Sequence, residues 1–164
     1  MNETLSTYFA GEKNGGLVLI GMGVVSLIAC IVFFPAKLEL RSFAITVGAW
    51  SLLELSVGIG LFMKTDAQVG ALQTRLTTDK AAMIAAETPR METVQRNFVF
   101  IQYVWLTFIV LGAFLGWFFK ESNATLAGVA LGFLLNAAMF LPFEISAERR
   151  GAVYLAALKS PPAQ

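Results

Sequence analysis

The sequence predicts an all-α integral membrane protein built as a bundle of four transmembrane helices. Four long apolar runs carry this prediction, at residues 15–36, 42–63, 98–119 and 124–143. Each is about the twenty residues that a helix rising ~1.5 Å per residue needs to cross a ~30 Å hydrocarbon core. Because 57% of the chain is hydrophobic and only 14% is charged, we expect residues 1–164 to form a single membrane domain.

The basic residues predict the orientation. With four spans, both termini and the 64–97 segment share one side of the membrane. That side would hold nine basic residues, and the other side would hold only Lys37, Arg41 and Lys120. The positive-inside rule therefore predicts that both termini and the 64–97 segment are cytoplasmic, in a plasma membrane or a bacterial inner membrane.

The 64–97 segment is predicted to be a cytoplasmic helical hairpin between the second and third spans. Its apolar residues are heptad-like, at Val69, Leu72, Leu76 and Met83. A turn near residues 77–79, with Thr78 as helix N-cap, would give two arms of similar length. The alternative starts a new helix with Thr88 as N-cap and leaves residues 65–86 along the membrane surface.

After the fourth span, Pro142 is expected to kink or end the helix. Residues 144–158 then form a short interfacial helix. Arg149 and Arg150 on this helix would lie near anionic lipid headgroups, as a terminal anchor rather than a specific lipid site.

Small residues predict how the helices pack in lipid. Gly112 and Gly116 are four residues apart in the third span, and Gly128 and Gly132 repeat that spacing in the fourth. A tight hairpin between these two spans is therefore expected. Further small residues on the first two spans predict self-association, or assembly with other membrane subunits.

Glu54 is the residue that most needs an explanation. It lies near the middle of the second span, where a carboxyl group costs about 2.5–3.5 kcal/mol on insertion scales. Ser51 and Gly58 on the same helix face favour contact with another helix rather than with lipid.

Counting along the spans predicts a polar layer at one depth. Glu54 and Asn136 both lie twelve residues from the outer ends of their spans, and Thr107 and Ser26 fall within about a turn of that level. Without a cation nearby, Glu54 would be largely uncharged and would donate a hydrogen bond to Asn136 or to a carbonyl. Replacing it with Leu would then cost about 1–2 kcal/mol.

Composition argues against several classes of function. The chain has no His and one Cys, Cys30, and its net charge is +1. We therefore expect no metal site, no cofactor and no nucleic-acid partner. A lone intramembrane acid lacks the nucleophile, base and orienting group of a catalytic site, so we expect no enzyme.

Two functional hypotheses remain. In the first, which the sequence favours, the protein is a non-enzymatic membrane scaffold or accessory subunit, with the hairpin as the surface for its partner. In the second, it is a small proton- or cation-conducting protein whose ion site is Glu54. A water-filled path reaching Glu54 would favour the second.

Overall fold

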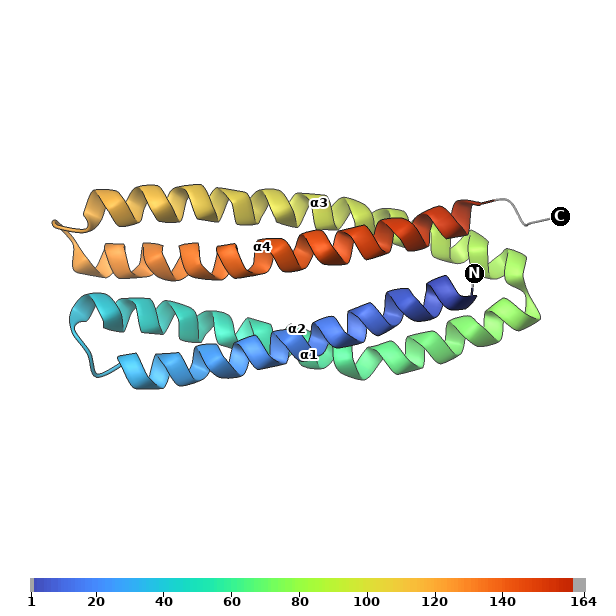
Figure 1. Cartoon of the computed structure of the whole chain (residues 1–164), viewed down its shortest axis with the longest axis horizontal. Coiled ribbons are helices and arrows are strands. Elements are labelled where there is room, and N and C mark those ends of the chain that lie inside the picture. Colours follow the sequence, from blue (N-terminus) through green and yellow to red (C-terminus); the bar gives the residue numbers. More distant parts are fainter. Residues whose placement is uncertain (1, 161–164) are drawn as a thin grey trace.

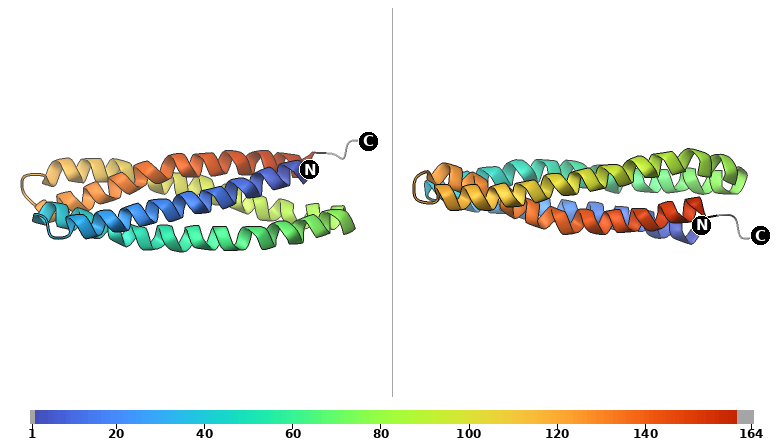
Figure 2. Two further views of the ribbon diagram at one scale, coloured as in Figure 1. Left: turned by 60° about the horizontal axis from the view of Figure 1, so that its bottom comes forward. Right: turned by 90° about the horizontal axis from the view of Figure 1, so that it is seen from above.

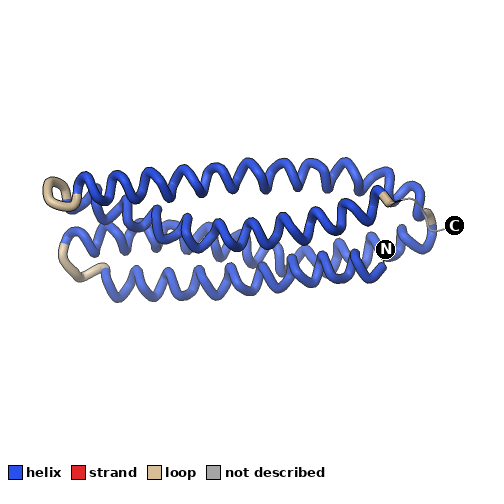
Figure 3. Tube along the Cα trace, turned by 45° about the horizontal axis from the view of Figure 1, so that its top comes forward, coloured by secondary structure: helices blue, strands red, loops and turns tan. Residues whose placement is uncertain are grey.

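The structure is a computed structural model, and it describes residues 2–160. These residues form four α-helices, α1 (Asn2–Phe33), α2 (Leu38–Thr78), α3 (Lys80–Phe119) and α4 (Ala124–Lys159). Figures 1 and 3 show the helices extended along the long axis of the molecule, with no strand in the part described. The predicted all-helical fold with four long apolar helices is therefore confirmed.

The helices pack as two antiparallel hairpins (Figure 2). One hairpin is α1 with α2 and the other is α3 with α4; the two meet mainly along α2 and α4, which run parallel to each other. Of the helix pairs that touch, α2 and α3 share the least contact. This leaves the α2–α3 side of the molecule as the most open one.

All four helices are long and apolar enough to cross a membrane. They contain 32 to 41 residues, and so rise about 48–62 Å, well beyond a ~30 Å hydrocarbon core. Exposed large hydrophobic side chains mark one part of this length. Apart from Val153, those among the described residues all lie within 17–63 or 99–139. We call this zone the apolar belt.

Beyond the apolar belt, the helices form a hydrophobic core at the end that holds the termini. We call it the end core, and its buried members are Leu5, Tyr8, Phe9, Met83, Met91, Tyr154 and Leu158. Tyr8 stacks on Tyr154 with ring centroids 5.0 Å apart. The apolar seam of the 64–97 segment packs against this core, so it is used within the chain.

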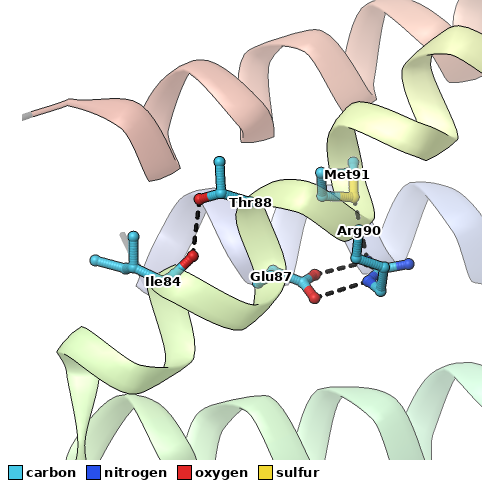
Figure 4. A network of polar contacts seen from close by, with 5 residues as sticks. All are labelled: Ile84, Glu87, Thr88, Arg90 and Met91. Carbon is cyan, nitrogen blue, oxygen red and sulfur yellow. Dashed lines mark hydrogen bonds and ion pairs between the residues drawn. The ribbon is translucent and has the colours of Figure 1, made fainter.

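Ion pairs accompany the end core. Figure 4 shows Arg90 donating from Nε and Nη2 to the two carboxylate oxygens of Glu87, at 2.7 and 2.6 Å. Glu87 is only 4% exposed, so this bidentate pair supplies the partner that a buried carboxylate requires. Lys13 pairs with Asp66 at 2.6 Å, which ties α1 to α2.

The turn between α2 and α3 lies where the arm lengths predicted it, but Asp79 rather than Thr78 provides the N-cap. The Asp79 side chain accepts a hydrogen bond from the Ala82 N–H at 2.9 Å. The alternative start at Thr88 is wrong, because Thr88 lies inside α3 and donates to the Ile84 carbonyl. Asn123 caps α4 in the same way, accepting from the Leu126 N–H at 3.0 Å.

Two prolines lie inside helices. Pro89 is within α3 and Pro142 is within α4. The sequence predicted a separate interfacial helix over residues 144–158, and the structure corrects this prediction. These residues continue α4, and Ala147, Gly151 and Tyr154 are buried. Pro142 lacks a backbone N–H, but this does not end α4, because the residues before and after Pro142 are packed against other helices.

Candidate functional site

A cavity of about 390 Å³ lies among the four helices and reaches Glu54. Its wall is mainly apolar and includes Trp50 from α2, Trp105 from α3 and Phe140 from α4. Trp105 stacks on Phe140 with centroids 4.8 Å apart, and Trp50 lies 5.3 Å from Trp105. The wall also carries three carboxyl groups and one guanidinium, from Glu12, Glu54, Glu144 and Arg150. A largely apolar cavity with a few converging polar groups is the usual form of a ligand site.

Glu54 is positioned by the contact between α1 and α2. Gly16 and Gly58 lie opposite each other there, and a Cβ on either would come 2.8 Å from the carbonyl oxygen of the other. This close approach leaves Glu54 1% exposed. The small residues on the Glu54 face of α2 do therefore mark a helix contact.

The carboxyl group of Glu54 has no hydrogen-bond partner: both of its oxygens are buried and unpaired. Ser26 of α1 is its polar neighbour and is itself buried; the Ser26 hydroxyl lies near enough to act on the carboxyl group, although no hydrogen bond of normal geometry joins them. Buried polar groups in proteins nearly always have a partner. An unpaired carboxyl group in the wall of a cavity is thus available to a ligand or an ion inside the cavity.

The polar layer expected from the sequence assembles only in part. Asn136 is buried, but it donates to the Gly132 carbonyl of its own helix at 2.8 Å. Thr107 is exposed and donates to the Tyr103 carbonyl of its own helix. Counting residues gave depth, but it could not give the rotation of each helix about its own axis.

Other polar atoms around the cavity are also unpaired. The indole N–H of Trp105, Oε2 of Glu144 and Nε of Arg150 are buried without a hydrogen-bond partner. Together with Glu54 they line one continuous space. Their number indicates a cavity that holds water or a ligand rather than a dry packing defect.

The end of the cavity nearest the end core has a charged rim, formed by Glu12, Glu144 and Arg150. Burial raises the pKa of Glu144 to about 7, and the neighbouring Glu12 carboxylate adds to this. Burial also raises the pKa of Glu12, while the Arg150 and Arg90 guanidinium groups act in the opposite direction. The rim therefore provides a proton-exchanging group near neutral pH.

Arg150 takes a different place from the one expected. It crosses Gly11 of α1, where a Cβ would come within 2.5 Å of its Nε, and it lines the cavity. Arg149 is exposed. The lipid-headgroup position predicted for both arginines thus stays a prediction for Arg149, because the two neighbours point about 100° apart on a helix.

The four packing glycines are divided between two contacts. Gly112 faces α4, where a Cβ would come 2.9 Å from the Ala130 carbonyl oxygen, and Gly116 is in ordinary contact with Leu131. Gly128 and Gly132 face α2 instead, against Ser42 and Thr46. The expected tight α3–α4 hairpin therefore forms with Gly112 at its close contact, while Gly128 and Gly132 let α2 and α4 approach instead.

Sequence reasoning missed Glu12 and Glu144. A usable signal was present: each borders an apolar run, and in a four-span chain those two borders lie on the same side. Carboxyl groups beside converging helix ends are candidates for the rim of a cavity.

Among the described residues, no group of three or more His, Cys, Asp and Glu side chains is placed to hold a metal ion. Comparison with models of known protein families, with curated proteins and with solved structures gave no match.

Proposed function

We propose that the chain is a four-span integral membrane protein that carries a proton or a cation by way of Glu54. The observation that carries this proposal is the cavity, which leads from the charged rim to a buried carboxyl group without a partner. Carboxyl groups retained inside a membrane at an energetic cost commonly mark ion pathways.

The apolar belt supports the membrane part of the proposal. A water-soluble protein of this size does not expose apolar side chains around four helices over residues 17–63 and 99–139. Glu54 lies within this belt, while Glu12, Glu144 and Arg150 lie outside it. The cavity would therefore connect the membrane interior to the side that holds the termini, which the positive-inside rule makes cytoplasmic.

The scaffold hypothesis relied on the hairpin as a partner surface. That surface receives less support, because its apolar seam contacts the end core. A scaffold also gives no reason for an unpaired carboxyl in a cavity. No catalytic reaction is assigned.

The test is ion flux in proteoliposomes. The wild type is expected to show a pH-dependent proton or cation flux, and Glu54→Gln is expected to lose it while keeping the shape of the side chain. Glu39→Gln is the matched control, since Glu39 is an exposed carboxylate on the same helix and does not line the cavity. A wild type without flux would return the protein to the scaffold class.

A further inference from the structure

We propose that the cavity binds a monovalent organic cation, a substituted ammonium with apolar groups, whose charge pairs with Glu54. This inference rests on the proposed function, because it names the kind of cation that the Glu54 site takes. Three features of the cavity support it: its charge, its wall and its opening.

The ionisable groups of the cavity favour a cation over an anion or a neutral ligand, because a cation bound beside a carboxyl group stabilises its charged form. Its wall has three carboxyl groups against one guanidinium. Arg150 and Arg90 both act on Glu12, at the rim. Glu54 has no such partner, and no basic residue of α3 lines the cavity. Glu54, the deepest of the three carboxyl groups, is therefore without a basic partner.

The wall of the cavity offers few oxygen ligands to an inorganic cation. Calcium takes six to eight oxygen ligands and magnesium keeps several waters, whereas the surroundings of Glu54 are mostly carbon. Trp50, Trp105 and Phe140 lie on this wall instead. Aromatic rings attract an ammonium through their faces and accept its apolar substituents by contact. One carboxylate with several aromatic rings is thus a site for a substituted ammonium.

The size and the opening of the cavity agree with this occupant. A volume of about 390 Å³ falls within the range of small-molecule sites. Leu53 and Val57 of α2 line the cavity and are each more than half exposed, on the side where α2 and α3 have little contact. The cavity therefore opens towards the apolar belt as well as towards the charged rim, which would admit a cation that dissolves in the membrane.

The probe for the first test is benzyltrimethylammonium, titrated into the detergent-solubilised full chain while tryptophan fluorescence is recorded. Trp117 is 73% exposed and does not line the cavity, so a Trp117→Phe background leaves Trp50 and Trp105 as reporters. We expect a saturable fluorescence change. The neutral carbon analogue (2,2-dimethylpropyl)benzene has the same shape and is expected to give none. Equal binding of the two probes would overturn the proposal.

Variants test where the charge binds. Glu54→Gln is expected to weaken binding of benzyltrimethylammonium at least about tenfold, and Glu39→Gln is expected to leave it unchanged. Glu54→Asp keeps the negative charge and should retain more binding than the Gln variant. Unchanged binding in Glu54→Gln would overturn the proposal, as would displacement of the probe by millimolar sodium or potassium. Circular dichroism checks that each variant is folded.

The flux assay separates this inference from the proposed function. Flux that depends on Glu54, with no binding of benzyltrimethylammonium, would overturn the organic-cation inference and leave the ion site standing. Binding that depends on Glu54, without flux, would support the inference and remove the transport part of the proposed function. Absence of both would overturn both.

Discussion

At the residue scale, Glu54 does not form the hydrogen bonds that the sequence predicts for it. Asn136 and Thr107 each donate a hydrogen bond to a carbonyl of their own helix, and the Glu54 oxygens remain unpaired. A buried group without a partner lowers stability, because it loses its water without gaining a hydrogen bond. Retaining such a group in a long apolar helix is more easily explained by function than by stability.

This environment reverses the stability prediction made from the sequence. Glu54→Leu should leave the free energy of unfolding unchanged or raise it by about 1 kcal/mol, since no other side chain loses a partner. Equilibrium unfolding in mixed micelles measures the change. A loss of about 1–2 kcal/mol in the Leu variant would instead show that the carboxyl group stabilises the fold.

Glu144 predicts a pH dependence of stability. Folding raises its pKa from 4.5 to about 7, so the folded protein keeps a proton that the unfolded chain releases within this range. The free energy of unfolding should therefore fall as pH rises from 4.5 to 7 and level off above it. Melting temperatures across that range check this.

The control for the pH prediction is a pair of carboxyl variants. Glu144→Gln should flatten the dependence, because it removes the titrating group and relieves Glu12 of a like charge. Glu121→Gln should not, since Glu121 is exposed at the far end of the molecule. A slope that persists in Glu144→Gln would assign the effect to another group.

At the element scale, glycines decide which helices approach closely. The α1–α2 contact uses Gly16 and Gly58, and the α2–α4 contact uses Gly128 and Gly132. A Cβ built on Gly60 of α2 would meet no atom of another helix within 4 Å among the described residues, so this small residue is not required for a close helix contact there. Only part of the small-residue pattern therefore serves the internal packing.

Gly58→Ala should destabilise the protein by about 1–3 kcal/mol, because its Cβ would meet backbone atoms of α1 that cannot move separately. Gly60→Ala is the control two residues away on the same helix, and it should be neutral or slightly stabilising. Unfolding of the two variants side by side gives the comparison. Equal losses would contradict the close α1–α2 approach.

At the scale of the whole molecule, the apolar belt and the end core divide the four helices into two zones. Exposed apolar side chains end near Met63 and begin again at Val99, while the residues between them bury their apolar seam in the end core. The zone with the termini is therefore stable by its own packing and ion pairs, and it would stand outside the bilayer on one side.

Cysteine labelling tests this orientation. In a Cys30→Ser background, a cysteine at position 73 should be protected from an impermeant reagent in intact cells, and one at position 37 should react. The reason is the excess of basic residues on the side of the termini. The reverse pattern would invert the orientation and place the rim of the cavity outside the cell.

The sequence by itself determined the number of helices, their apolar lengths, the turn before α3 and the presence of a carboxyl group inside an apolar run. These depend on residues close together in the chain, such as the four apolar runs and the turn at residues 77–79. Tertiary structure decided which residues meet Glu54, that Gly128 faces α2, and that Arg150 turns into the cavity. Those outcomes depend on how each helix is rotated about its axis. Helices that are apolar on almost every side carry little pattern to predict that rotation, because lipid and protein interior favour the same side chains.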